Sequence, residues 1–262
     1  MNYETIRSTK EGSILHLKLN RPESLNSMSL KMAEELVRIV EEINQDDEVR
    51  VVILSGEGRA FCSGGDISFL QVISKMTASE VRNFVYQVQR KLGSIAYIEK
   101  PVIASIHGFA LGAGLSLALL CDIRIAAENA LLGMEFVKMG IIPELGAKHF
   151  LPRIVGLGKG LELAITGDRI NGKEAERIGL INRAVSEDQL SPVTLELAKK
   201  ISSLGPIAVR LVKRSFKGDF LRDLDATFEY EADLNAICYL TEDFGEAAKA
   251  FKEKRKPVFK GK

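Results

Sequence analysis

Apolar strands and amphipathic helices alternate along the first 190 or so residues of the chain. Helical spacing in residues 32–44, MAEELVRIVEEIN, places Ala33, Leu36, Val37, Val40 and Ile43 on one face. Nearly continuous apolar strands that alternate with helices predict an α/β fold whose sheet is covered on both sides. The predicted strands are SILHLKLN (13–20), VRVVILSG (49–56), PVIASIHG (101–108) and DIRIAAEN (122–129).

A second helix is predicted over residues 77–95, where Thr77 and Glu80 have the spacing of a capping box ahead of an apolar stripe. Beyond about Asp188 the strand pattern fades, and stretches such as FEYEADLNAICYLTEDFGEAAKAFKEK are helical in character. We therefore predict a core over residues 1–195, which holds any catalytic site, and a helical C-terminal region over 196–262.

Residues 101–121 contain no charged side chain, and the run is long enough to cross a membrane. Pro101, His107 and three glycines interrupt it, however. PVIASI is typical of a buried strand and LSLALLC of a short buried helix, with a tight turn between them. We therefore expect a strand, a turn and a helix, and no membrane partner.

Composition narrows the range of partners and compartments. There are 36 basic and 35 acidic residues, a net charge of +1, which argues against a polyanion such as nucleic acid as the general partner. The three cysteines, Cys62, Cys121 and Cys238, form neither a disulfide pattern nor a metal-binding spacing. The first residues, MNYETIRSTKEG, lack a secretory signal. A reducing, cytoplasmic setting is expected.

Two glycine-rich segments follow predicted strands and are the best candidates for a site. The first glycine loop is GEGRAFCSGGDI (56–67), and the second is GFALGAG (108–114), which leads into the predicted buried helix. Neither matches the dinucleotide or phosphate-loop patterns, and no serine lies in a G-x-S-x-G motif. Glycine turns are often no more than tight packing. Two adjacent turns could nevertheless direct two amide N–H groups at one oxygen, which is an oxyanion hole.

The chain resembles the crotonase superfamily, the enoyl-CoA hydratase/isomerase family, over nearly its whole length. The two glycine motifs in tandem are the most specific part of the likeness. The matching segments are NRPESLNSM (20–28), RAFCSGGDI (59–67), KPVIASIHGFALGAGLSLALLCDIRIAA (100–127), MGIIPELG (139–146), LPRIVG (151–156), TGDRINGKEAERIGLINRAV (166–185) and AFKEKRKPVF (250–259).

This resemblance implies a spiral core of ββα units followed by a C-terminal helical region that forms trimers, often paired into hexamers. It also implies an acyl-CoA thioester substrate and no metal or redox cofactor. The family's two oxyanion donors correspond to the backbone N–H groups of Gly65 and Ala113.

The likeness breaks at the positions of the two glutamates with which family hydratases hold water. These positions are occupied here by Ser116 and Phe136, and Glu135 is one residue out of place. Family members that move a double bond can instead have an acid directly after the proline of the following turn, where this chain has Glu144. Apolar neighbours of Glu144 could raise its pKa toward neutrality, which suits a general base.

By resemblance, the coenzyme A moiety is bound by both ends of the chain. Phe251 and Lys254 of the basic tail are expected to approach it, often from a neighbouring subunit, although a basic tail can also be simply solvated. The expected adenine and pantetheine path consists of Ser24, Leu25, Ala60, Ser63, Gly64, Asp66 and Ile67.

Three functions remain open. The leading hypothesis is an isomerase that converts 3-enoyl-CoA to 2-enoyl-CoA, with Glu144 as base. The second is an enoyl-CoA hydratase with an atypical acid/base set. The third is a non-catalytic CoA- or RNA-binding member of the family, although the chain lacks tryptophan and a basic-aromatic pattern for stacking bases.

Overall fold

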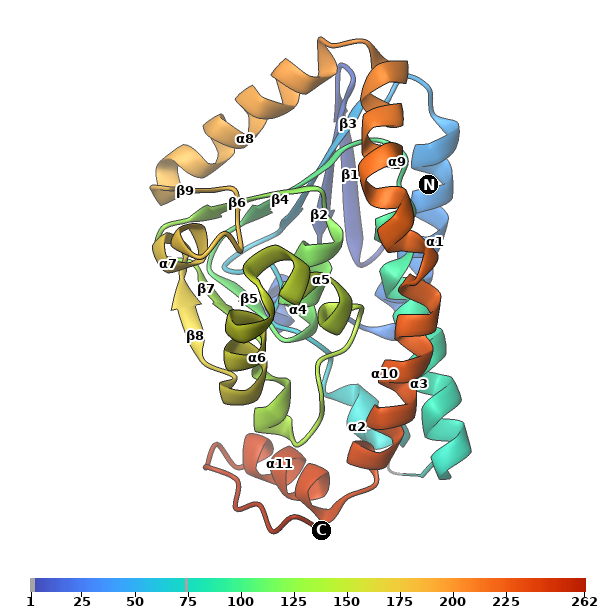
Figure 1. Cartoon of the computed structure of the whole chain (residues 1–262), viewed down its shortest axis with the longest axis vertical. Helices are drawn as coiled ribbons and strands as arrows, with labels where there is room; N and C mark the ends of the chain where they lie inside the picture. The colour runs from blue at the N-terminus through green and yellow to red at the C-terminus, as the bar shows by residue number, and fades with distance from the viewer. Residues whose placement is uncertain (1–2, 74) are drawn as a thin grey trace.

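The computed structural model describes residues 3–73 and 75–262 and contains two sheets surrounded by helices (Figure 1). The main sheet has six strands in the order β1-β2-β3-β4-β6-β9, in which β1 and β2 form an antiparallel hairpin and the remaining neighbours are parallel. Its strands are β1 (Ile6–Glu11), β2 (Ile14–Leu19), β3 (Val51–Gly56), β4 (Val102–Ile106), β6 (Ile123–Ala127) and β9 (Arg183–Val185).

Each of the four strands expected from the sequence is present, whereas β1 has no counterpart in the apolar pattern. Only Ile6 of β1 is buried, because β1 is the edge strand and its other side chains face solvent. An exposed edge strand of this kind lacks the alternation that a sequence pattern detects.

The second sheet is small, and its strands alternate along the chain with the last strands of the main sheet. It has the order β5-β7-β8, with strands β5 (Phe109–Leu111), β7 (Leu131–Gly133) and β8 (Arg169–Asn171). The chain runs from β4 of the main sheet into β5 and then into helix α4 (Ala113–Leu120), which is one ββα unit. The isolated bridge Cys62↔Ala110 extends the same arrangement to the segment that follows β3. This places the two glycine loops beside each other.

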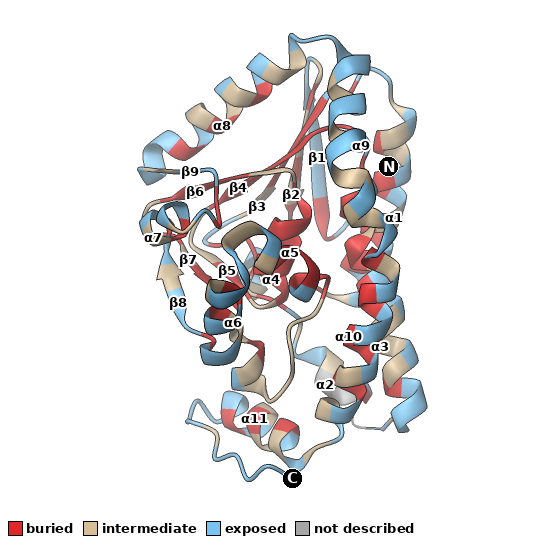
Figure 2. Ribbon diagram, in the orientation of Figure 1, coloured by how far each residue is buried: buried red, intermediate tan, exposed pale blue. Residues whose placement is uncertain are grey.

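Helices enclose the sheets, and burial is concentrated in the main sheet and α4 (Figure 2). Helix α8 lies across β3, β4 and β6, whereas α1 packs on α3, which in turn packs on α10. The bounds are α1 (Leu30–Gln45), α2 (Ser68–Ile73), α3 (Ala78–Leu92), α5 (Ala147–Val155), α6 (Leu157–Thr166), α7 (Gly172–Arg177), α8 (Glu187–Ser202), α9 (Pro206–Arg222), α10 (Leu224–Tyr239) and α11 (Glu242–Lys252), with 3-10 turns η1 (Pro22–Ser24), η2 (Gly93–Tyr97) and η3 (Glu135–Met139).

The predicted helices form, and the buried face of α1 differs in part from the predicted one. Thr77 and Glu80 form the expected capping box at the start of α3. In α1 the predicted residues are buried except Val37, which is half-buried, and Met32, Glu35 and Ile39 are buried as well. The Glu35 carboxylate accepts hydrogen bonds from the N–H groups of Glu4 and Thr5 and so holds the start of β1, a long-range role that helical spacing does not reveal.

The uncharged run forms strands and a short helix inside the protein. All eight residues of α4 are buried, so this helix has no polar face. No helix in residues 3–73 or 75–262 is long and apolar enough to cross a membrane. Residue 195, the expected end of the core, lies within α8, and the division into 1–195 and 196–262 stays a prediction.

Two lysines attach helix α9 to the core. Asp122, at the start of β6, pairs with Lys213 at 2.6 Å and with Lys217 at 3.0 Å, and all three side chains are largely buried. Asp122 also accepts a hydrogen bond from the N–H of Val102, 2.7 Å away. Helix α9 is therefore fixed to the starts of β6 and β4, and β4 is the strand that leads into the second glycine loop.

Candidate active site

The two glycine loops pack directly against each other. The N–H of Cys62 donates to the Phe109 carbonyl at 2.9 Å, and the N–H of Leu111 donates to the Cys62 carbonyl at 3.1 Å. A Cβ atom at Gly114 would lie only 2.2 Å from the Cys62 carbonyl oxygen. Glycine is required at 114 because the start of α4 meets the backbone of the first loop here.

The amides of Gly65 and Ala113 remain available as donors. Met28 pairs with the first loop on both sides of Gly65: its N–H donates to the Gly64 carbonyl at 2.8 Å, and its carbonyl accepts from Asp66 at 2.9 Å. Ala113 is the first residue of α4, where an amide has no acceptor within its own helix. Within residues 3–73 and 75–262 no other acceptor is found for either amide.

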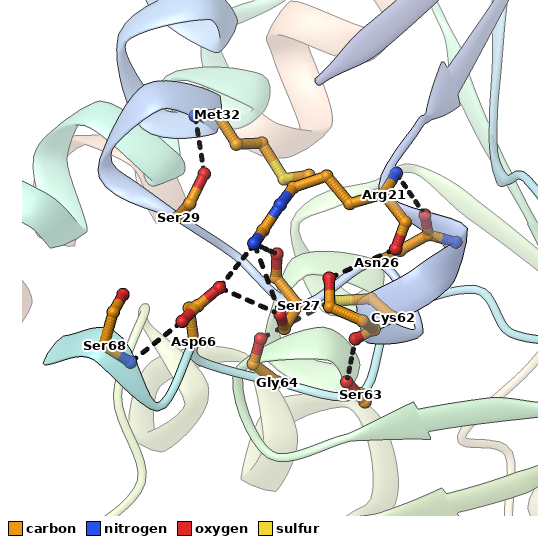
Figure 3. Close-up of polar contacts among 11 residues, drawn as sticks. Arg21, Asn26, Ser27, Ser29, Met32, Cys62, Ser63, Gly64, Asp66 and Ser68 are labelled. Atoms are coloured by element: carbon orange, nitrogen blue, oxygen red, sulfur yellow. Dashed lines mark hydrogen bonds and ion pairs between the residues drawn. The ribbon is translucent and has the colours of Figure 1, made fainter. Parts of the chain in front are cut away.

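Residues 21–28 form a clamp on the first glycine loop (Figure 3). The Arg21 guanidinium donates to the Ser27 carbonyl at 2.7 Å and lies 2.6 Å from Asp66 Oδ2, and Asp66 Oδ1 accepts from the N–H of Ser68 at 2.8 Å. Burial raises the pKa of Asp66, but the hydrogen bonds from Ser68 and Arg21 outweigh it and hold this pKa below its ordinary value. Arg21 and the Ser68 N–H thus hold the ionised Asp66, and this fixes the backbone directly after Gly65.

The positions that hold glutamates in family hydratases contain no carboxylate here. Ser116 is fully buried in α4, and its hydroxyl donates to the Gly112 carbonyl at 3.4 Å. Phe136 is buried with its ring close to Gly112. The neighbouring Glu135 forms a two-pronged ion pair with Arg169, both contacts at 2.9 Å, and also pairs with Lys138. Although burial raises the pKa of Glu135, the bonds from Arg169 and Lys138 hold it below the ordinary value. Both carboxylate oxygens of Glu135 are therefore engaged in ion pairs with Arg169 and Lys138.

Glu144 has the opposite electrostatic environment. It follows Pro143 in the segment between η3 and α5, and its Oε1 accepts a hydrogen bond from the Tyr239 hydroxyl at 2.9 Å. Burial raises the pKa of the Glu144 carboxyl to about 7, and the Tyr239 bond opposes this rise only in part. A carboxyl that exchanges its proton near neutral pH is suited to general acid/base chemistry.

A second apolar cluster, beside the main hydrophobic core, connects the surroundings of Glu144 with those of Gly65. Its buried members are Ile73, Val81, Val85, Ala232, Ala236 and Phe244. Tyr239 and Ile141 pack on this cluster from the Glu144 side. Phe69 packs on it from the first loop, and its ring lies within contact distance of a Cβ added to Gly65. The second apolar cluster thus extends between the proposed acid/base group and one proposed oxyanion donor.

The sequence analysis missed the groups that hold Glu144 in place. Tyr239, Asn235 and Glu231 of α10 and Gln89 of α3 all hydrogen-bond to the segment 142–148. The only signal in the sequence was the four-residue spacing of polar side chains at 231, 235 and 239 on one face of the predicted helix. Their partners lie 83 to 95 residues away along the chain, which no local pattern reveals.

Most residues assigned to the coenzyme path lie in loops that hydrogen bonds join to one another. The Ser63 N–H donates to the Leu25 carbonyl at 3.0 Å, the Ser63 hydroxyl donates to the Ser24 carbonyl at 3.3 Å, and the Ala60 carbonyl accepts from the Asn26 side chain at 2.7 Å. Gly64 and Asp66 are bound by Met28 of the clamp, and Ile67, which follows them, is exposed.

The tail residues assigned to the coenzyme lie apart from these loops within one chain. Phe251 and Lys254 are exposed at the end of α11, which packs on α10 and η3. The structure does not bring them to the loops of residues 24–25 and 60–67 within one subunit.

Histidines and surface hollows do not add to the site. His107 Nε2 contacts the Gly58 carbonyl at 2.9 Å, and His149 packs edge-on against Phe150 and Phe220. In the described part of the chain no cluster of His, Cys, Asp and Glu has the arrangement of a metal site. Shallow hollows lie on α9, between Leu211 and Arg222, and beside α11, away from Glu144.

Comparison with known proteins agrees with this arrangement. The family model described as enoyl-CoA hydratase/isomerase matches residues 9–262. The chain belongs to the enoyl-CoA hydratase/isomerase family.

Named relatives in this family have different activities. A crotonyl-CoA hydratase of Syntrophomonas wolfei is 41% identical over 260 residues, which is 99% of each chain. A 1,2-epoxyphenylacetyl-CoA isomerase of Escherichia coli is 34% identical over 263 residues, again 99% of each chain. Among solved structures, an enoyl-CoA hydratase/isomerase from Pseudoalteromonas atlantica superposes with a TM-score of 0.87 at 29% identity, covering 98% of this chain and 100% of the other. The crotonase-like α/β fold with a helical C-terminal region is confirmed, and the family includes hydratases and isomerases.

Proposed function

We propose that this family member is an enoyl-CoA isomerase that converts a 3-enoyl-CoA to a 2-enoyl-CoA. The observation that supports it most strongly is the single carboxyl of Glu144, whose pKa burial raises to about 7. Ser116 and Phe136 stand where a water-holding pair of carboxylates would be needed, and neither side chain exchanges a proton with water near neutral pH.

In the proposed reaction, one carboxyl group moves one proton. Ionised Glu144 removes a proton from C2, and the electron pair of that C–H bond moves onto the thioester oxygen as an enolate. The amides of Gly65 and Ala113 donate hydrogen bonds to this oxyanion, and each such donor is worth about 3–4 kcal/mol in the transition state. The protonated Glu144 then returns the proton to C4, the carbonyl re-forms, and the double bond moves from C3–C4 to C2–C3. No metal or redox cofactor takes part.

Hydration is the second candidate, and it is favoured by the 41% identity with a crotonyl-CoA hydratase. It would need a second group to activate water beside Glu144. Glu231 is a candidate because the charge of Glu144 acts on it, and burial raises its pKa to about 8. Its two oxygens, however, accept from the N–H groups of Gly146 and Lys148, so the carboxyl is engaged with the backbone.

The two functions are separated by incubating the full chain with a 3-enoyl-CoA and with a 2-enoyl-CoA in parallel. We expect 2-enoyl-CoA from the first, and a loss of about 10²–10⁴-fold in kcat for Glu144→Gln, the usual range for removal of a general base. Formation of 3-hydroxyacyl-CoA from the second substrate, undiminished in Glu144→Gln, would rule out the isomerase.

We also propose that the chain assembles as a homotrimer, or as a hexamer of two trimers. Large apolar side chains on α9 support this, since Ile207, Leu211, Val212 and Phe216 are each more than half exposed in the single chain. A neighbouring subunit could then bring Phe251 and Lys254 to the coenzyme loops. Sedimentation analysis of the full chain tests the assembly, and a mass of one subunit would contradict it.

A further inference from the structure

Helix α10 presents three polar side chains, one turn apart, to the segment containing Glu144. The spacing of four residues between Glu231, Asn235 and Tyr239 places them on one face of the helix. Glu231 accepts from the Gly146 N–H at 2.9 Å and from the Lys148 N–H at 3.3 Å. Asn235 accepts from the Ile142 N–H at 3.0 Å and donates to the Ile142 carbonyl at 3.3 Å. The helix therefore binds both ends of the segment 142–148.

The backbone between these ends is fixed in an unusual conformation. Leu145, the residue after Glu144, has φ 60°, which is uncommon for a residue with a branched side chain. Its N–H donates to Gln89 Oε1 of α3 at 2.8 Å. Such a conformation persists only where the surroundings enforce it, as α3 and α10 do here. The backbone from which the Glu144 side chain projects is consequently held in one conformation.

Tyr239 differs from the other two because it bonds to a side chain. Its hydroxyl donates to Glu144 Oε1 at 2.9 Å, and its ring packs edge-on against Phe244, with centroids 4.7 Å apart. This contact and the second apolar cluster hold the ring in place. The bond occupies Oε1, and in the described part of the chain no hydrogen bond to Oε2 is found.

We propose that Tyr239 is a positioning residue for the reaction: its hydroxyl fixes Glu144 Oε1 and favours the ionised carboxylate, so that Oε2 is free to take the substrate proton. This inference rests on the proposed function of Glu144. A donor to a carboxylate stabilises the charged form, and here it opposes the effect of burial on the Glu144 pKa.

Other titratable groups also contribute to the electrostatic environment of Glu144. Glu231 and Cys238 of α10 have pKa values raised chiefly by burial and further by the charge of Glu144, and Lys148 of α5 lies close enough to lower that of Glu231. From α11 the neighbour of Tyr239 is the apolar Phe244, and from α3 it is the neutral Gln89. Removing the Tyr239 hydroxyl alone leaves all of these groups in place.

The test compares Tyr239→Phe with Tyr230→Phe, an exposed tyrosine of the same helix whose ring contacts Lys148. The pH dependence of kcat is measured on 3-enoyl-CoA with the full chain. For Tyr239→Phe we expect kcat to fall about tenfold, KM to stay within about twofold, and the acidic limb to move up by about 1 pH unit, the shift that corresponds to one charge-assisted hydrogen bond. Tyr230→Phe is expected to match the wild type.

Two outcomes distinguish this inference from the proposed function. If Glu144→Gln abolishes isomerisation but the acidic limb of Tyr239→Phe stays at the wild-type pH, the role of Tyr239 is disproved and the function stands. If Glu144→Gln is active, the proposed function fails. The pairing is then judged from urea unfolding alone: the pH interval over which Glu144→Gln changes stability must extend upward by about 1 unit in the Tyr239→Phe background. An unchanged interval would disprove the pairing.

Discussion

Arg21 and Asp66, which are 45 positions apart in the sequence, form an ion pair of 2.6 Å beside the Gly65 amide. Their side chains retain only 22% and 12% of their solvent exposure, and Ser27 and Ser68 supply further hydrogen bonds. The pair joins the segment of residues 21–28 to the first glycine loop. One proposed oxyanion donor therefore depends for its position on a charge pair outside the glycine motifs.

Asp66→Asn is expected to destabilise the protein by about 1–3 kcal/mol, because a largely buried guanidinium loses its charged acceptor. The Asp66 pKa is below its ordinary value in the folded state, so the wild-type advantage is complete above about pH 4 and is lost as the pH falls through the folded-state pKa. Urea unfolding between pH 3 and pH 8 measures this. Arg177→Met, which breaks an exposed pair with Glu174, should leave the urea midpoint nearly unchanged.

Gly114→Ala is expected to prevent the two glycine loops from packing. Its Cβ would lie 2.2 Å from a backbone carbonyl that cannot move without breaking the bond from Leu111, so we expect a loss of more than about 3 kcal/mol or failure to fold. Gly158→Ala is the matched control, because Gly158 lies in α6 with no atom within 4 Å of an added Cβ. That change should stabilise by about 0.5–1 kcal/mol. Equal thermal midpoints for both variants would contradict the packing argument.

Ala113→Pro removes one proposed donor with little effect on the fold. Proline is favoured at the first position of a helix, where its missing N–H leaves no helix bond unmade. We expect a melting temperature close to wild type and a fall of about 10²–10³-fold in kcat, the usual cost of one oxyanion donor. Leu157→Pro, at the exposed first position of α6, serves as the control for activity. A variant that keeps its fold and full activity would exclude the Ala113 amide from the reaction.

The raised pKa of Glu144 affects activity and stability in opposite directions. The base must be ionised, so kcat should rise with pH to a plateau above about pH 7. Between the ordinary pKa of about 4.5 and about 7, the folded chain keeps a proton that the unfolded chain has lost, so this group contributes less stability as the pH rises through that interval. We expect Glu144→Gln to unfold at a higher urea concentration than wild type at pH 8 and at a similar one at pH 4. A variant less stable at pH 8 would contradict the burial of this charge.

Local sequence patterns were sufficient for four strands of the main sheet, for helices α1 and α3, and for the helical character of the C-terminal region. The four apolar strands, the helix that starts at the Thr77 capping box and the turn before α4 were predicted because strand alternation, helix periodicity and capping act within a few residues. The choice of Glu144 as the candidate base followed from family resemblance and the absence of carboxylates at 116 and 136. Its role as base stays a prediction.

Tertiary structure decided what surrounds each of these groups. Glu135 pairs with Arg169, whereas Glu144, nine positions later, is half-buried and hydrogen-bonds to Tyr239. The pKa values of these two glutamates are thus shifted in opposite directions, and no local sequence pattern distinguishes the two residues. The physical reason is that burial and hydrogen bonding set these pKa values, and both depend on segments that only the whole fold brings together, here α10 and β8.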